Sequence, residues 1–430
     1  MAPAQCLAGS VVDLPEADSS LFPCMALGRT FLPKSPMRIL ISTRLFPNRL
    51  DDTRGIYILK QAVALKKHAE IRVVAPVPYV PSLARIKQYN MYTGIPVKDL
   101  IAGIDVTYPR FVVIPKVFRF LHGFFMTASL AKTYSEIIDE FRPDVILGFF
   151  AYPDGVANVR IARRCGLPVV IGVRGSDVNR MARSGLQRKI IAKALASSDK
   201  VLAVSSALRD EVLRLGVDER KAVVVTNGID VEQFGDIGRA DARSRLELGT
   251  NGKIVLCVTR LSEEKGVDIL LEAFALFSEP DIRLVVVGEG VQMACLERRV
   301  GELGLHDRVR LAGRKPHSEI PLWMAAADLV VLPSRVEGHP NAILEALASG
   351  RPVVASRVGG VPEIMTSNGY GILVEPGDAA GLAQAIRLAL NKEWDTEQIL
   401  QRGRARSWDH VAEELLAEIE STVREFGAKG

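Results

Sequence analysis

Two successive series of short β-branched runs, each run followed by a longer amphipathic stretch, constrain the fold of this chain more than any other feature. Such alternation is typical of strand–helix–strand units, in which parallel strands form a sheet with helices on both faces. The first series predicts strands at residues 38–42, 71–75, 145–147, 169–172 and 200–204. The second predicts strands at 253–258, 284–288, 309–311, 329–332 and 353–355. We therefore expect an α/β protein with two Rossmann-like, doubly wound domains.

The change from one series to the next sets the domain boundaries. A chain of 430 residues is too long for one compact core. Turn-forming residues between Thr226 and Asp230 mark the boundary, which gives an N-terminal domain of residues 37–226 and a C-terminal domain of residues 227–407. Residues 408–430 are expected to form a last helix that crosses back to the first domain. Residues 1–36 read as a disordered tail, and Met37, which begins the first strand, is a candidate start of the native chain.

Apolar runs and cysteines exclude several classes of protein. No apolar run approaches the roughly eighteen residues that span a bilayer. The five cysteines are scattered, without the paired spacing of a zinc site or a disulfide framework. The first 36 residues lack the basic start and apolar stretch of a secretory signal. These features predict a cytoplasmic protein.

The net charge of +5 conceals a difference between the two halves. Residues 38–226 carry 30 basic and 16 acidic side chains, a net +14, whereas residues 227–430 carry 23 and 31, a net −8. A basic half favours an anionic partner, such as a membrane surface or a phosphorylated acceptor. Residues 115–125 interleave bases with aromatic residues, which suits either the inner face of a cell membrane or ordinary core packing. No recognised nucleic-acid-binding module accompanies this segment, so we expect no nucleic acid partner.

The segment from Glu337 to Glu345 carries the strongest sign of chemistry. It follows a predicted buried strand, and a helix is expected to begin at about Pro340 and to end at Gly350. Gly338 would let a ligand approach the backbone, and the free amides of the first helical turn form an anion site. The two carboxylates would then bracket a diphosphate. The alternative is that both are solvated charges on the helix surface.

Two further loops follow predicted strands of the second domain, where ligands bind in doubly wound sheets. Arg260 and Lys265 follow the strand at 253–258, and together they can neutralise a leaving diphosphate. Taken singly, each is more often a surface cation. Gly359 and Gly360 follow the strand at 353–355 and permit close approach of a ligand, although a plain tight turn is an equal alternative. Gly288-Glu289-Gly290 lacks the third glycine of a dinucleotide-binding loop.

In this order and spacing, Arg260, Lys265, the Glu337–Glu345 pair and Gly359-Gly360-Val361-Pro362-Glu363 resemble the retaining glycosyltransferases of family 4. The resemblance covers nearly all of residues 37–426 and implies the GT-B fold, in which two Rossmann-like domains face each other across a cleft. It implies catalytic roles for Glu337, Arg260 and Lys265, the last two holding the donor diphosphate, and a ribose contact for Glu345. It also implies that the donor sugar, phosphates and base lie near Gly338, His339, Pro340, Asn341, Gly313, Lys315, Gly359 and Gly360.

The first domain is less decisive, as expected for the domain that selects the acceptor. Gly55 lies in a loop that often carries two glycines in the family, but here there is one. Arg174 and Phe149 lie near positions where many relatives have histidine. Arg174 is expected either to meet an acceptor phosphate or carboxylate or to form an ion pair with Asp177.

The resemblance implies transfer of a sugar from a nucleotide diphosphate donor to an acceptor hydroxyl of a polysaccharide or lipid-linked glycan, with retention of configuration. The six histidines show no ligand spacing and no Asp-x-Asp motif is present, so we expect no metal and no cofactor. His339 is equally suited to a donor contact or to solvent. The alternatives are a sugar-nucleotide epimerase of the same architecture, a catalytically silent nucleotide-sugar-binding subunit and a nicotinamide-dependent oxidoreductase.

Overall fold

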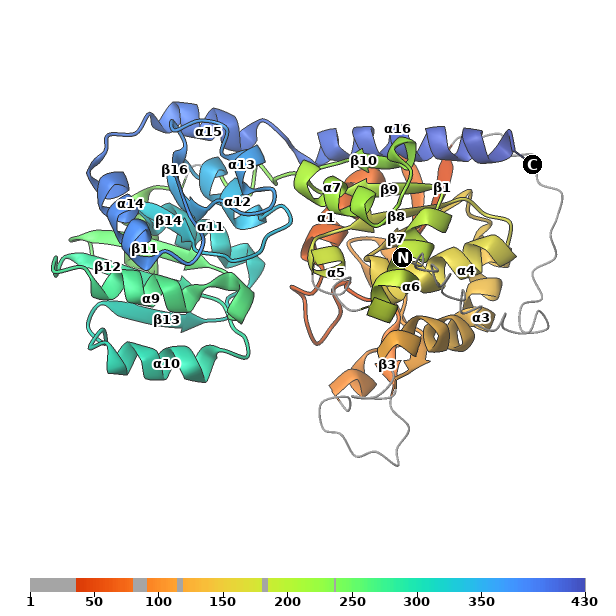
Figure 1. The fold of residues 1–430 in the computed structure, drawn as a ribbon, viewed down its shortest axis with the longest axis horizontal. Helices are drawn as coiled ribbons and strands as arrows, with labels where there is room; N and C mark the ends of the chain where they lie inside the picture. The colour runs from red at the N-terminus through yellow and green to blue at the C-terminus, as the bar shows by residue number, and fades with distance from the viewer. Residues whose placement is uncertain (1–35, 80–90, 114–118, 180–184, 236, 430) are drawn as a thin grey trace, which may run out of the picture.

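The computed structural model describes residues 36–79, 91–113, 119–179, 185–235 and 237–429. These residues form two lobes side by side, each a β-sheet with helices packed against it (Figure 1). Each strand expected from the sequence is present, so the predicted α/β class and the two doubly wound domains are confirmed. The predicted disordered tail lies almost entirely outside the described residues and stays a prediction.

The sheet of the first lobe has eight described strands in the order β10-β9-β8-β7-β1-β2-β5-β4, and only the β4–β5 pair is antiparallel. Its inner strands β7 and β8 are buried along their whole length, which explains their continuous apolar sequences. The strands span Met37–Ser42 (β1), Ala69–Val74 (β2), Lys98–Ile101 (β4), Ile104–Thr107 (β5), Val145–Phe149 (β7), Val169–Val173 (β8), Lys200–Ala203 (β9) and Ala222–Val224 (β10). A separate pair joins β3 (Val77–Tyr79) to β6 (Arg110–Val112).

In the second lobe, six described strands form a parallel sheet in the order β13-β12-β11-β14-β15-β16. The chain therefore reverses its direction of growth between β11 and β14, and doubly wound sheets bind ligands in the crevice at such a reversal. The first sheet reverses in the same way between β1 and β7. The strands span Lys253–Val258 (β11), Ile282–Val287 (β12), Val309–Gly313 (β13), Leu329–Leu332 (β14), Val353–Ser356 (β15) and Gly371–Val374 (β16).

Helices cover both faces of each sheet and bury apolar clusters against them. In the first lobe they span Ile56–Leu65 (α1), His122–Phe141 (α3), Val156–Arg164 (α4), Ser176–Asn179 (α5), Gly185–Ser197 (α6) and Ser206–Arg214 (α7). In the second they span Arg239–Arg245 (α8), Val267–Ala275 (α9), Met293–Glu302 (α10), Ile320–Ala326 (α11), Asn341–Ala348 (α12), Val361–Ile364 (α13), Ala379–Asn391 (α14) and Thr396–Arg404 (α15). Short helical turns occur at Met91–Gly94, Arg119–Leu121, Ala151–Gly155, Glu219–Lys221, Glu263–Lys265 and His317–Glu319.

The last helix, α16 (Trp408–Gly427), leaves the second lobe and runs along the first (Figure 1). Its buried side chains, including Leu415 and Ile419, share one apolar cluster with residues of β1 and α1. The chain therefore crosses between the lobes twice. The two crossings lie side by side, because the Ile229 amide donates to the Arg406 carbonyl at 3.0 Å and the Trp408 amide donates to the Ile229 carbonyl at 3.3 Å.

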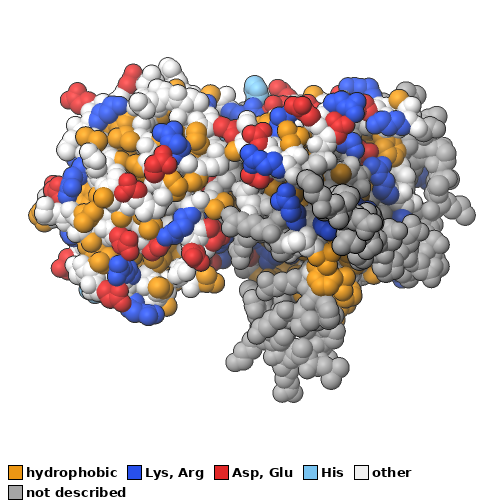
Figure 2. Space-filling model, in the orientation of Figure 1, with side chains coloured by type: hydrophobic (Ala, Val, Ile, Leu, Met, Phe, Trp, Pro, Cys, Tyr) orange, Lys and Arg blue, Asp and Glu red, His pale blue; other side chains and the backbone are white. Residues whose placement is uncertain are grey.

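The segment at 115–125, which suits either a membrane interface or core packing, lies partly outside the described residues. Its described side chains Phe120 and Phe124 pack against the core of the first lobe, and the Arg160 guanidinium lies 4.6 Å from the Phe124 ring centre. Core packing therefore accounts for these two rings. None of the helices in the described ranges has the length and apolar character needed to cross a membrane. On the face shown in Figure 2, basic and acidic side chains are interspersed over both lobes.

Candidate functional site

A cavity of about 370 Å³ lies between the two lobes, which is within the range of about 300–1,000 Å³ typical of ligand pockets. Its walls come from loops that follow the carboxyl ends of strands in both sheets, at the reversals described above. Several residues predicted from the sequence line it together: Gly55, Arg174, Arg260, Lys265, Glu337, His339, Pro340 and Asn341. The sequence therefore located one wall of this cavity in each half of the chain.

An ion pair between Lys265 and Glu337 occupies the wall from the second lobe. The Lys265 ammonium donates to Glu337 Oε1 at 2.7 Å, and the Ser334 hydroxyl donates to the same oxygen at 2.6 Å. Glu337 is only 7% exposed, so these two donors compensate a carboxylate that is nearly removed from water. Gly266, at a φ of +63°, lets the loop that carries Lys265 pack against the segment after β14, because a Cβ there would lie 2.1 Å from the Pro333 carbonyl oxygen.

Helix α12 begins at Asn341, one residue later than the sequence analysis expected. Pro340 is its N-cap in an extended conformation, with a φ of −75° and a ψ of 112°, so the proline ring precedes the first turn. The Asn341 side-chain oxygen accepts a hydrogen bond of 2.7 Å from the side-chain amide of Asn227, which lies on the crossing between the lobes. The amino end of α12 therefore faces the cavity, where its unpaired amides favour an anion.

The glycines of this region serve close packing between backbones. A Cβ on Gly338 would lie 2.3 Å from the carbonyl oxygen of Arg174, so the first lobe occupies the space that we assigned to a ligand. A Cβ on Gly359, where φ is +51°, would lie 2.0 Å from the Glu337 carbonyl oxygen. The Gly360 amide donates to the Gly338 carbonyl at 2.9 Å. These glycines shape the loop that carries Glu337, and a direct contact with donor stays a prediction.

Arg260 lies at the edge of the cavity with 64% of its side chain exposed. Its guanidinium donates to Glu264 at 2.9 Å, across one turn of the same loop. Exposed pairs of this kind contribute little to stability, so the side chain can exchange Glu264 for a stronger anion at low cost. Its contact with a diphosphate stays a prediction.

Glu345 connects the two lobes through residues that the sequence analysis missed. The Tyr57 hydroxyl donates to Glu345 Oε1 at 2.9 Å, and His317 Nε2 lies 3.2 Å from the same oxygen. Burial, and then the charge of Glu345, raise the pKa of Tyr57 well above its ordinary value, so the phenol keeps its proton and acts as a donor. Glu345 is 2% exposed, which excludes the alternative of a solvated surface charge. Its contact with ribose stays a prediction.

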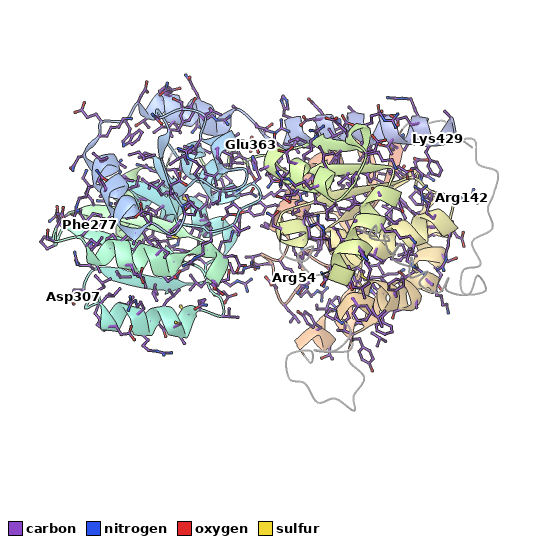
Figure 3. The ribbon with its side chains drawn as sticks, in the orientation of Figure 1. Arg54, Arg142, Phe277, Asp307, Glu363 and Lys429 are labelled. Carbon is purple, nitrogen blue, oxygen red and sulfur yellow. The ribbon has the colours of Figure 1, made fainter. Side chains whose placement is uncertain are left out.

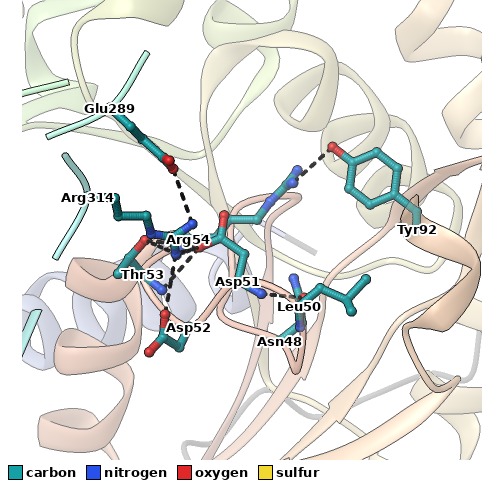
Figure 4. Close-up of polar contacts among 9 residues, drawn as sticks. All are labelled: Asn48, Leu50, Asp51, Asp52, Thr53, Arg54, Tyr92, Glu289 and Arg314. Atoms are coloured by element: carbon teal, nitrogen blue, oxygen red, sulfur yellow. Dashed lines mark hydrogen bonds and ion pairs between the residues drawn. The ribbon is translucent and has the colours of Figure 1, made fainter. Parts of the chain in front are cut away.

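The loop after β13, expected near the donor base, makes a second connection between the lobes. Gly313 ends the strand at a φ of +69°, and the Lys315 ammonium lies 5.6 Å from the centre of the Trp323 ring. Between them, Arg314 donates to Asp51 at 2.6 Å and to the Thr53 hydroxyl at 2.8 Å in the first lobe. Figure 4 shows Arg314 between the first-lobe loop of Asp51 and Thr53 and the Glu289 carboxylate of its own lobe. Sequence reasoning missed Arg314.

Glu363 makes a third connection. Its carboxylate accepts hydrogen bonds from the amides of Ser206 at 2.9 Å and Ala207 at 3.0 Å, at the amino end of α7 in the first lobe. A carboxylate in this position is favoured by the unpaired amides and the dipole of the helix. Figure 3 shows Glu363 where the lobes meet. The segment from Gly359 to Glu363 thus includes a contact that joins the two lobes.

Asp177 and Arg174 lie together but do not share a side-chain hydrogen bond among the described contacts. The buried Asp177 carboxylate accepts from the backbone amides of Ala151, Gly175 and Arg174 at 2.8, 3.0 and 3.2 Å. The Arg174 guanidinium instead donates to Gln61 Oε1 at 2.5 Å and to the Asn227 side-chain oxygen. Of the two expected roles of Arg174, the direct ion pair with Asp177 is therefore not formed, because each group has other partners.

His339 is largely shielded from water, so of its two expected roles the structure argues against the solvent-exposed one. Burial is the main cause that lowers the pKa of His339 to about 3, and the charges of Arg406, Arg174 and Arg402 add to it. Its Nδ1 is buried and has no hydrogen-bond partner in the described part of the chain. The imidazole is therefore neutral at physiological pH and can serve as a hydrogen-bonding group but not as a cation.

This shift predicts a loss of stability in acid. Unfolding restores the ordinary pKa of His339 near 6.5. Between this pH and about pH 3, the unfolded chain therefore binds a proton at His339 that the folded protein does not bind. Below about pH 6 the wild type should lose up to about 1.4 kcal/mol per pH unit more than a His339→Gln variant. Urea unfolding of both proteins at pH 7 and pH 5 measures this difference. An identical pH dependence in the two proteins would contradict the buried, neutral state of His339.

Comparison with known proteins agrees with these features. The family described as Glycosyltransferase Family 4 matches residues 55–233, and the family described as Glycosyl transferases group 1 matches residues 238–406. The chain is 30% identical over 358 residues to the putative teichuronic acid biosynthesis glycosyltransferase TuaC of Bacillus subtilis, covering 81% of this chain and 88% of TuaC. It is also 30% identical to the amylovoran biosynthesis glycosyltransferase AmsK of Erwinia amylovora, over 65% of this chain and 70% of AmsK.

Solved structures share the fold at lower identity. A sucrose-phosphate synthase from Thermosynechococcus elongatus superposes with a TM-score of 0.75 at 21% identity, covering 92% of this chain and all of that chain. The Anabaena protein HepE in complex with UDP and glucose gives a TM-score of 0.69 at 21% identity, covering 90% of this chain and all of that chain. From its similarity to TuaC, from both family matches and from its two facing Rossmann-like domains, this chain belongs to the group 1, family 4 glycosyltransferases with the GT-B fold.

Proposed function

We propose that this glycosyltransferase moves a sugar from a nucleotide diphosphate donor to an acceptor hydroxyl, with retention of the anomeric configuration. The observation that carries the proposal is the Lys265–Glu337 ion pair beside the amino end of α12, inside a cavity bounded by both lobes. TuaC and AmsK are named for teichuronic acid biosynthesis and amylovoran biosynthesis, and a structure of HepE contains UDP-glucose. We propose a polysaccharide or a lipid-linked glycan as the acceptor, and the names of TuaC and AmsK support the first of these.

In the proposed reaction, the bond between the anomeric carbon and the donor diphosphate breaks while a bond to the acceptor oxygen forms on the same face. The acceptor proton passes to the departing phosphate. Lys265, Arg260 and the amides of α12 would stabilise the charge that develops on the diphosphate, usually the largest contribution in such a reaction. Glu337 would hold the Lys265 ammonium in place and contact the donor sugar.

The proposed chemistry uses no metal and no cofactor, because two cations and a helix terminus supply the positive charge that the leaving diphosphate requires. We also propose that the protein works in the cytoplasm and reaches its acceptor at the inner face of the cell membrane. The net +14 of residues 38–226 supports contact with anionic headgroups or with an anionic acceptor.

The stereochemistry of the product tests this function. Proton NMR of the first product formed should show the same anomeric configuration as the donor, and turnover should be equal in EDTA and in magnesium. An inverted product would overturn the retaining mechanism. Inversion at C2 of the donor without any acceptor would identify an epimerase, and tight donor binding without turnover would identify a silent binding subunit.

A further inference from the structure

Arg174 is a cation on the wall of the cavity, and its guanidinium forms no ion pair with a carboxylate of the described residues. Its guanidinium donates to two neutral amide oxygens, those of Gln61 and Asn227. No acidic side chain in the described ranges lies within ion-pair distance of it, although most other arginines near the interface have such a partner. Its Nε is buried and makes no hydrogen bond to any described residue. Neutral oxygens therefore hold the guanidinium in place, and the charge of the buried Asp177 acts on it without a direct contact among the described residues.

The surroundings keep this guanidinium fixed and electropositive. It lies 4.8 Å from the centre of the Phe149 ring, and its amide partners come from α1 and from the crossing between the lobes. Burial lowers the pKa of Arg174 to about 10, so the group is still charged at physiological pH. A desolvated cation that keeps its charge gains most from an anion brought by a ligand.

Arg174 and the proposed diphosphate site come from different lobes. Lys265, Arg260 and α12 belong to the second lobe, whereas Arg174 follows β8 of the first lobe and lines the same cavity. The Asn227 side chain lies between them, because it accepts from Arg174 and donates to Asn341 Oδ1 at 2.7 Å. Asp177, the nearest acid in the sequence, is occupied by three backbone amides and leaves the guanidinium available. A ligand that spans the cavity could therefore present one anionic group to each lobe.

We propose that Arg174 selects a substrate sugar that carries a carboxylate or a phosphate, and that this second anionic group binds to the part of the cavity wall that the first lobe supplies. The inference rests on the proposed function, because it places a sugar in the cavity. The anionic sugar is either the one transferred from the donor or the one on the acceptor that receives it. Both sources present the same chemistry to a guanidinium, which binds carboxylate and phosphate through paired N–H groups.

The first experiment measures donor binding by calorimetry. Of UDP, ADP, GDP and dTDP, the best-bound nucleotide is chosen, and its glucose and glucuronate esters are compared on wild type and on Arg174→Gln. If the donor carries the anion, wild type should bind the glucuronate ester about tenfold or more tightly than the glucose ester, as expected for a charged hydrogen bond. Arg174→Gln should remove this preference and leave the affinity for the free nucleotide unchanged.

The second experiment addresses the acceptor. If wild type prefers the neutral donor, kcat/KM is measured with acceptor saccharides that carry a carboxylate or phosphate and with their neutral counterparts. Arg174→Gln should then lower kcat/KM about tenfold or more for the charged acceptors alone, and Arg174→Lys, which keeps the charge, should recover part of the loss. Arg220→Gln removes an exposed arginine of the same lobe and should match wild type in both experiments.

The inference is overturned if Arg174→Gln loses affinity or kcat/KM equally on charged and neutral substrates, or if it keeps the wild-type preference for charged substrates. It is also overturned if Arg174→Gln binds the free nucleotide more weakly, which would place Arg174 on the diphosphate. Thermal unfolding of each variant shows whether an equal loss comes from misfolding, in which case Arg174→Lys decides the question by its selectivity. Wild type that binds none of the four nucleotides would contradict the proposed function itself. Wild type that binds nucleotide but shows no charge preference in either experiment would contradict only the role of Arg174.

Discussion

Replacing Lys265 with alanine is expected to lower kcat about a hundredfold or more at saturating donor, the loss typical of removing one preorganised group that stabilises transition-state charge. Lys265 is 20% exposed on its side chain and reaches both the cavity and Glu337. The ammonium would stabilise the negative charge that develops on the diphosphate in the transition state more than it stabilises the bound donor. Its loss should therefore lower kcat more than donor affinity. Steady-state kinetics with the preferred nucleotide sugar measures both quantities.

Loss of Lys265 also leaves the Glu337 carboxylate nearly buried without its cation, so stability should fall as well. A double variant, Lys265→Ala with Glu337→Gln, should recover the lost melting temperature without recovering kcat. Lys253→Ala, which removes an exposed lysine at the start of β11, should match wild type in both measurements. A kcat of Lys265→Ala within threefold of the wild-type value would remove Lys265 from the reacting site.

Replacing Gly338 with alanine is expected to lower kcat/KM about a hundredfold while the protein stays folded. The added methyl group would lie 2.3 Å from the Arg174 carbonyl oxygen, so one lobe must move away from the other. A displacement of about an ångström between catalytic groups is enough for a loss of this size. The nucleotide alone should bind nearly as well as before, because its proposed contacts lie within the second lobe.

Gly238→Ala is the matched control for this prediction. Gly238 is exposed at the amino end of α8, and an added Cβ there meets no heavy atom within 4 Å. Both variants should keep melting temperatures within a few degrees of wild type, because neither site lies in an apolar core. Gly338→Ala with wild-type kcat/KM would show that the close approach of the lobes at this point is not needed for turnover.

The sequence predicted the parts of the fold that depend on burial. Strands such as β8 and β14 are buried on both faces, and their continuous apolar runs are visible without any structure. Strands β4 and β5 were missed because exposed or half-buried positions interrupt their apolar residues, and β16 was missed because it begins with a glycine. Short, partly exposed strands carry too little periodicity to be distinguished from loops.

Some contacts of the candidate site could also be predicted from the sequence, and others could not. Lys265 and Glu337 could be placed together because both follow strands at the point where the sheet reverses direction. Tyr57 and Glu345 are 288 residues apart in the sequence, and their hydrogen bond depends on how the two lobes face each other. The same holds for Arg314 with Asp51. Contacts between the two lobes leave no local pattern in the sequence, so sequence reasoning could not find them.

A crystal structure with the best-bound nucleoside diphosphate tests the central claim most directly. Phosphate oxygens are expected within hydrogen-bonding distance of the Lys265 ammonium and of the first amides of α12, in the cavity between the lobes. Density for the diphosphate elsewhere on the protein, with Lys265 still paired only to Glu337, would contradict it.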